Sequence, residues 1–260
     1  MSASTIRNGY NEGQVHPLAD AFRNDFAGVG ATMTFYSKEA QITVINKDGE
    51  PDRFQEYSGI AYADSLFFNI FDFDFIAGNP STALINRGTA VITSSLAQKY
   101  FKLKPSEVSQ AVGKSVLVNN TVTFVITGVV ADPPKNSDLP FTFIGDYADQ
   151  FATNPYFKNG VDWDEYNSDT NCWITLPGGT TAQSLEDQLP PFLEKYCGKE
   201  ERRSRNIFFN RSPNCITIHV LRITITGPSA ILCSAYSQWS DCFSLSAQVS
   251  TSSICRPRRP

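Results

Sequence analysis

The sequence has no cysteine before Cys172 and no lysine after Lys199. Because its first 171 residues lack cysteine, that part of the chain cannot be held together by a disulfide framework. No run of about 18 apolar residues occurs, so we expect no membrane-spanning helix in this sequence. The stretch from Met1 to Gln14 is polar and has no apolar core segment, so we expect that it is not a secretory signal.

The charges are divided unevenly along the chain, whose formal net charge is −4. Residues 201–260 carry eight arginines and two acidic side chains, for a net charge of +6, and residues 1–200 have a net charge of −10. Nucleic-acid binding requires a basic face, which the acidic body lacks. The arginines near the C-terminus are scattered rather than clustered. We therefore predict no nucleic-acid partner.

The composition is that of an aromatic-rich globular protein. Hydrophobic residues make up 41% of the chain and charged residues 18%, with 19 Phe and 10 Tyr. This apolar content suffices for a sizeable core, and the low charge argues against intrinsic disorder. The length of 260 residues fits one or two domains.

Few residues could form a metal or nucleophilic site. His16 and His219 are the only histidines. Cys215 and His219 have a spacing that occurs in metal sites, but no second ligand pair follows at a zinc-like distance. No G-x-S-x-G motif and no P-loop occurs.

Two groups of carboxylates are candidates for acid–base chemistry. One is Asp162-Trp163-Asp164-Glu165, and the other is Asp72 with Asp74. A glycosidase needs two carboxylates about 5–10 Å apart across a cleft, and neither group has a supporting motif. We interpret both as solvated charges. We predict that the protein is not an enzyme, that it has no catalytic, cofactor-binding or metal-binding residues, and that it needs no cofactor.

Hydrophobic periodicity predicts a mixture of strands and helices. Leu18, Phe22 and Phe26 repeat along one face and predict a helix over 15–26. Phe71, Phe73 and Phe75 alternate with aspartates and predict a strand with one solvent-exposed face. Further helices are expected over about 64–71, 94–101 and 181–196, and strands over 31–36, 41–46, 54–60, 90–93, 115–118, 122–130, 139–144 and 172–176.

Several of these blocks, taken in order, resemble the MacB-like periplasmic core domain of FtsX/MacB-type ABC transporter permeases, especially those of Bacteroidetes. The blocks are Ala63-Asp64-Ser65-x-Phe67-Phe68-x-Ile70-Phe71-x-Phe73, Gly78-Asn79-Pro80-x-x-Ala83-Leu84, Val91-Ile92-Thr93-x-x-x-Ala97-x-Lys99-Tyr100-Phe101, Ala111-Val112-Gly113-Lys114 and Phe124-x-Ile126-Thr127-Gly128-Val129-Val130-x-Asp132-Pro133-Pro134-x-Asn136-Ser137. Asp138 stands where the family usually has histidine. We expect Gly113 and Gly128 to permit tight backbone geometry.

The resemblance implies an α+β fold with two lobes: a porter-like strand–helix–strand lobe and an inserted, mostly β lobe. It implies a non-catalytic extracytoplasmic domain that transmits conformational change or docks partners during export, for example of antimicrobial peptides. The implied partners are an ATP-binding subunit, a second permease copy through the membrane part and a periplasmic adaptor. The implied location is the periplasmic face of the cell inner membrane. The alternative is an independent extracytoplasmic ligand-binding module.

The domain boundaries follow from the same resemblance. We expect a poorly ordered N-terminal segment at 1–16, the periplasmic core domain at 17–200 with the inserted lobe at about 59–140, and a non-native or disordered tail at 201–260. The chain would then be a fragment that lacks the first membrane helix.

The tail loses the family pattern after about Phe209. One codon string allowed for 249–258, read in a shifted frame, translates as Ile-Asn-Phe-Ile-Asn-Leu-Ser-Thr-Ala, which resembles a segment of the family's second membrane helix. We therefore predict a frameshift near 205–215. Residues from about 210 should add no native packing, and their cysteines should be free. Removal of 211–260 should leave the thermal midpoint of the rest unchanged or raise it.

Overall fold

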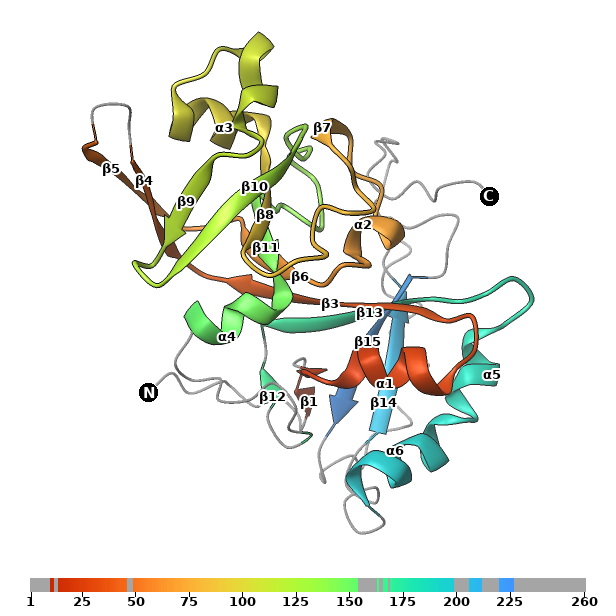
Figure 1. Cartoon of the computed structure of the whole chain (residues 1–260). Coiled ribbons are helices and arrows are strands. Elements are labelled where there is room, and N and C mark those ends of the chain that lie inside the picture. The colour runs from red at the N-terminus through yellow and green to blue at the C-terminus, as the bar shows by residue number, and fades with distance from the viewer. Residues whose placement is uncertain are drawn as a thin grey trace.

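A computed structural model of the chain describes residues 10–11, 14–45, 49–153, 163, 166–167, 169–198, 206–211 and 220–226 (Figure 1). The described strands form one large mixed sheet and one separate two-stranded sheet, with short helices around them. The prediction of an α+β fold is confirmed.

The large sheet contains 13 strands. In spatial order, its main path is β1 (Tyr10–Asn11), β15 (Val220–Thr226), β13 (Thr170–Thr175), β3 (Gly30–Ser37), β6 (Ile60–Ala63), β11 (Phe143–Asp146), β8 (Thr89–Thr93), β10 (Val122–Val130), β9 (Ser115–Val118), β4 (Ala40–Ile45) and β5 (Pro51–Glu56). Off this path, β14 (Asn206–Arg211) pairs with β15, and β7 (Phe75–Gly78) pairs with β10. The second sheet joins β2 (Gln14–Val15) to β12 (Tyr166–Asn167). The pairs β6–β11 and β8–β10 are parallel, and the other pairs are antiparallel.

The helices lie in two groups at opposite ends of the sheet (Figure 1). Next to β13–β15 lie α1 (Leu18–Asp25), α5 (Ala182–Glu186) and α6 (Leu189–Cys197). Next to β7–β10 lie α3 (Ser94–Phe101) and the 3-10 helix η1 (Pro105–Ala111), and α2 (Phe67–Ile70) lies between the two groups, against β3. The 3-10 helix η2 (Tyr147–Asp149) and α4 (Gln150–Thr153) follow β11. The strands β3 and β6 connect the two groups, because they pair with each other near the middle of the sheet.

Aromatic side chains dominate the core on both sides of the sheet. Phe22 of α1 packs against Phe26 and against Phe192 of α6, with ring centroids 5.1 and 4.9 Å apart. Burial of such large side chains is the main favourable contribution to folding. The helix predicted from Leu18 and Phe22 therefore forms at the predicted place and buries the predicted face.

The strand predicted from Phe71, Phe73 and Phe75 is wrong for its first part, because β7 begins only at Phe75. Phe71 is buried, and Phe67 and Phe73 have ring centroids 5.4 Å apart. Phe68 lies against Phe73 and Phe75 edge-on, at 5.5 and 5.0 Å. The alternating phenylalanines thus close a cluster around α2 instead of following one strand face.

Two glycines of the family motifs have the predicted tight geometry. Gly113 has a φ of +85°, a left-handed conformation that favours glycine. At Gly128, a Cβ atom would lie 2.8 Å from a ring carbon of Phe75. Another motif residue, Asp132, accepts hydrogen bonds from the backbone and hydroxyl of Ser95 at the start of α3. These motif residues have structural roles.

The strands β14 and β15 differ from the expectation of a tail without native packing from about residue 210. They pair with each other over six residue pairs, and β15 also pairs with β13 at Trp173, Ile174 and Thr175. Ile alternates with Thr over residues 223–226, and both residue types have high β-propensity. The frameshift stays a hypothesis, and residues 227–260 lie outside the described part of the chain.

Candidate functional site

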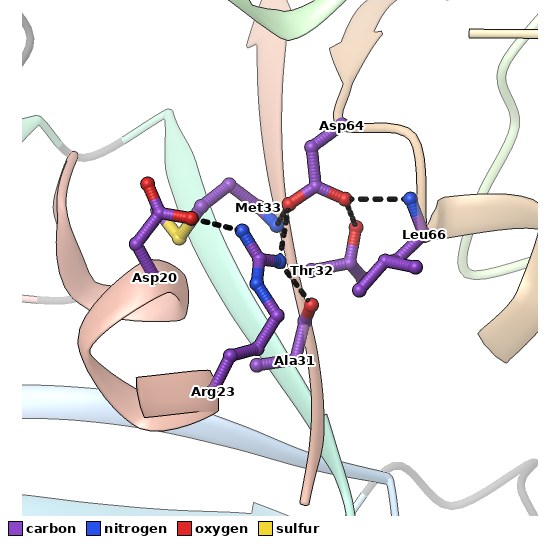
Figure 2. Close-up of polar contacts among 7 residues, drawn as sticks. All are labelled: Asp20, Arg23, Ala31, Thr32, Met33, Asp64 and Leu66. Atoms are coloured by element: carbon purple, nitrogen blue, oxygen red, sulfur yellow. Dashed lines mark hydrogen bonds and ion pairs between the residues drawn. The ribbon is translucent and has the colours of Figure 1, made fainter. Parts of the chain in front are cut away.

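The carboxylate of Asp64 joins three elements of the fold (Figure 2). Its Oδ1 accepts hydrogen bonds from the Thr32 hydroxyl at 2.6 Å and from the Leu66 backbone N–H at 3.1 Å. Its Oδ2 accepts from Arg23 Nη1 at 2.9 Å and from the Met33 backbone N–H at 3.2 Å. Asp64 follows β6 directly, so it connects α1, β3 and the β6–α2 connection at one point.

Arg23 in the last turn of α1 completes this junction. Its Nη1 also donates to the Ala31 carbonyl oxygen at 2.5 Å, and its Nη2 pairs with Asp20 one turn earlier on α1. Burial alone would lower the pKa of the Arg23 guanidinium, but the carboxylates of Asp64 and Asp20 raise it above its ordinary value. The guanidinium is therefore charged, and its planar fork binds both carboxylates and the backbone together.

A cavity of about 280 Å³ lies beside this junction. It is lined by His16, Ala19, Asp20, Arg23, Met33, Asp64, Ser65, Leu84, Ile85, Asp146, Tyr147, Ala148 and Phe151. These residues come from α1 and the turn before it, β3, the β6–α2 connection, the loop before β8 and the segment from the end of β11 through η2 to α4. Asp20 and Ile85 are exposed, so the cavity reaches solvent at its rim.

Two buried aspartates lie at the end of β11 and in η2. Asp146 is 8% exposed and caps η2 by accepting a hydrogen bond from the Ala148 backbone N–H at 3.0 Å. Burial, and next the nearby charge of Asp149, raise the pKa of Asp146 to about 6. Asp149 accepts a hydrogen bond from the Gly88 backbone N–H and lies 4.0 Å from the guanidinium of Arg87.

His16 forms another wall of the cavity and is itself buried. Its Nδ1 lies 2.7 Å from the Tyr147 hydroxyl, and its ring contacts Phe151 edge-on at 5.0 Å. Burial lowers the pKa of His16 to about 4, so the imidazole is neutral at pH 7. Burial also raises the pKa of the Tyr147 phenol, which stays neutral. The charge of the cavity therefore comes from its aspartates and Arg23.

Among the described residues, no group of three or more His, Cys, Asp or Glu side chains could hold a metal ion. Cys172 is fully buried on β13, and burial raises the pKa of its thiol, which keeps it in the unreactive protonated form. The arrangement can bind and orient a charged or polar group.

Of the candidate residues from the sequence, only Asp72, Asp74, Trp163 and His16 lie in the part of the chain that the structure describes. Asp72 and Asp74 are exposed between α2 and β7 and do not line the cavity. Trp163 stacks on Tyr196 with ring centroids 4.6 Å apart. Asp162, Asp164 and Glu165 lie outside the described residues, as do Cys215 and His219. Of the two histidines, His16 is in the cavity wall.

Sequence reasoning did not identify Arg23 or Asp146 as site residues. Arg23 lies off the apolar face of Leu18 and Phe22, where a charged residue of an amphipathic helix usually faces solvent. Asp146 is the last of the four buried residues of β11 and could have been noticed as a carboxylate at the end of a buried strand. Asp64 lies within a quoted motif, but nothing in the spacing shows that it accepts four hydrogen bonds.

The comparisons with known proteins agree on the type of domain. Residues 2–192 match the family model described as MacB-like periplasmic core domain. A similar solved structure is that of a domain from a Porphyromonas gingivalis protein provisionally assigned as a permease, with a TM-score of 0.54 and 19% sequence identity over 83% of this chain and 80% of that chain. This likeness concerns the fold. A comparison with curated protein sequences gives no significant match. Within the part of the chain that the structure describes, no helix has both the length and the apolarity needed to cross a membrane.

Proposed function

Because the chain belongs to the family of MacB-like periplasmic core domains, we propose that it works as a mechanical link in the extracytoplasmic part of an ABC transporter permease. In this proposal the helix α1 and the segment from 59 to 140, which we call the inserted segment, move together. Conformational change in the membrane part then reaches the outer end of the domain. The domain would act at the periplasmic face of the inner membrane.

The observation that carries this proposal is the set of four hydrogen bonds to Asp64. The carboxylate lies near the start of the inserted segment, and its donors belong to α1, to β3 and to the β6–α2 connection. Charge-assisted hydrogen bonds are shorter and stronger than neutral ones, and several at one carboxylate fix its orientation. A displacement of α1 therefore moves the start of the inserted segment with it.

The parallel pairing of β6 with β11 strengthens the same connection. The strand β6 begins the inserted segment and β11 directly follows it, and the two pair from Ile60 with Phe143 to Ala63 with Asp146. Both ends of the segment are thus held side by side in the sheet, and β6 pairs on its other side with β3. The inserted segment has a double attachment, which resists independent rotation.

We include in the proposal the partners that such a link requires. They are an ATP-binding subunit, a second permease copy through the membrane part and a periplasmic adaptor, with antimicrobial peptides as a class of exported substrate. The proposal is tested with the intact permease. Co-purification with an ATP-binding subunit, and loss of transport but not of ATP hydrolysis in Asp64→Ala, would support it.

Two results would oppose the proposal. Transport by Asp64→Ala at the unmodified level would show that the junction transmits nothing. Hydrolase activity of the chain that is abolished by Asp164→Ala would show an enzyme instead. A matched control is Asp74→Ala, because Asp74 is an exposed carboxylate in the inserted segment.

The second candidate function is an independent extracytoplasmic ligand-binding module. One observation favours it, namely the cavity beside the junction, with its aspartates and apolar walls. Ligand sites are typically concave and largely apolar, with a few polar groups that fix orientation. Saturable binding by the separated domain, with transport independent of Asp64, would favour this function over the first.

A further inference from the structure

We propose that the cavity beside Asp64 binds a small organic cation, a protonated primary amine on a short apolar stem, with its ammonium group next to Asp146. This inference goes beyond the mechanical role and does not depend on it. It rests on the charge, the lining and the size of the cavity.

The charge of Asp146 is the first argument. Its side chain lines the cavity, is 8% exposed and accepts a hydrogen bond from the Ala148 backbone N–H. Among the described residues, Arg23 pairs with Asp20 and Asp64, and Arg87 pairs with Asp149, but no ion pair includes Asp146. An ionised carboxylate that is buried without a cation is costly. A bound ammonium would remove that cost.

The protonation behaviour of Asp146 agrees with a missing cation. Burial and next the charge of Asp149 raise its pKa to about 6, and Asp64 acts in the same direction. The Ala148 N–H and the more distant Arg87 oppose these effects. His16, which lines the same cavity, is neutral at pH 7 because burial lowers its pKa to about 4. Above pH 7 the Asp146 carboxylate is therefore ionised and can bind a cation.

The remaining lining fits a short hydrocarbon stem. Met33, Leu84, Ile85 and Phe151 supply apolar surface, and the exposed Ile85 lies at the rim. The cavity volume of about 280 Å³ is just below the range of small-molecule pockets, ~300–1,000 Å³, so only a short stem fits. Because no group of three metal-ligating side chains occurs among the described residues, we infer an organic cation rather than a bare metal ion.

The test is a titration of the isotope-labelled full chain with n-pentylamine, followed by the shifts of its amide NMR signals. Sodium pentanoate serves as the control ligand, because it has a chain of equal length and the opposite charge. We expect saturable shifts at Ser65 and Ala148 with the amine and none with pentanoate. In Asp146→Asn, loss of a charge-assisted hydrogen bond should weaken amine binding about tenfold. In Asp74→Asn, whose carboxylate is exposed, affinity should be unchanged.

The unmodified chain offers a second readout that needs no folded variant. Pentylamine stays protonated below pH 10, as lysine does, so a change in affinity between pH 7.5 and 5 reports on the protein. With a pKa of about 6, Asp146 is mostly protonated at pH 5, and affinity should fall about tenfold. Absence of saturable amine binding, equal binding of pentanoate, or equal affinity at the two pH values would overturn the proposal.

Discussion

The Arg23 guanidinium donates a 2.9 Å hydrogen bond to Asp64, across 41 residues of sequence. The pair joins the last turn of α1 to the residue that follows β6. Both side chains are mostly buried, with 27% and 18% exposed. Breaking such a pair on one side leaves the other charge buried without its partner, which makes the junction sensitive to single substitutions.

We predict that Asp64→Ala destabilises the domain by about 3 kcal/mol, because a buried guanidinium and three further donors lose their acceptor. Urea denaturation measures the free energy of unfolding, and Asp74→Ala is the control at an exposed carboxylate. A loss below ~0.5 kcal/mol in Asp64→Ala, the usual range of surface changes, would contradict the buried junction.

Gly78 should be far less replaceable than Gly113. Both have positive φ, +90° and +85°, so alanine is strained at either position by about 1–2 kcal/mol. A Cβ at Gly78 would also collide with the Thr127 carbonyl oxygen and lie 2.7 Å from the Gly128 Cα, but at Gly113 it would meet open space. We expect Gly78→Ala to cost at least ~2 kcal/mol more than Gly113→Ala by denaturant titration. Equal costs would contradict the close approach of β7 to β10.

His16 and Asp146 should change stability with pH in opposite directions. The folded pKa of His16 is lowered from 6.5 to about 4, so its contribution is lost as pH falls through 6.5 toward 4. The folded pKa of Asp146 is raised from 3.8 to about 6, so the folded state binds more protons there and stability falls as pH rises through this window.

The two effects partly cancel, so the unmodified chain should show little pH dependence from this cavity between pH 4 and 6.5. The substitution Asp146→Asn removes the contribution of Asp146 to the pH dependence of stability, and its side-chain oxygen still caps η2. We expect this variant to be more stable than the unmodified chain at pH 7.5 by about 1–2 kcal/mol, and to lose stability more steeply on acidification. Thermal midpoints at pH 4.5, 6 and 7.5 provide the measurement. If the thermal midpoints of the two proteins changed with pH in the same way, the result would contradict a raised pKa of Asp146 in the folded state.

Two truncations test the C-terminal strands. Ending the chain at residue 226 keeps β14 and β15, and we predict an unchanged thermal midpoint. Ending it at residue 198 exposes the edge of β13, and we predict a midpoint that is lower by about 2–8 °C, for a loss of about 1–2 kcal/mol. An unchanged midpoint in the shorter chain would mean that β14 and β15 add nothing, as the frameshift hypothesis requires.

Local patterns predicted most elements, because short-range chemistry determines them. The apolar stripe of Leu18 and Phe22 located α1, and the β-branched run ending at Val130 located β10. The phenylalanines at 71 and 73 were misread, because their partners Phe67 and Phe68 lie on the preceding helix and alternation alone cannot reveal this.

The candidate site could not be predicted in the same way. Arg23, Asp64 and Asp146 are far apart in the sequence, and only pairing of β6 with both β3 and β11 brings them to one cavity. The pattern of charges along the chain does not show which carboxylate forms an ion pair with an arginine. The family motif includes Asp64 but gives no sign of its four donors.

The central claim is that α1 and the inserted segment move as one body because Asp64 holds them together. It is tested most directly by double electron–electron resonance, which measures the distance between two spin labels. The labels are attached at Asn24→Cys and Val125→Cys in the intact permease, with its other cysteines replaced. Both positions are exposed, on α1 and on β10. With Asp64 present, we predict one narrow distance distribution that is the same in the nucleotide-free and ATP-bound states, and a broader one in Asp64→Ala. A distance that changes between the two states while Asp64 is present would contradict the claim.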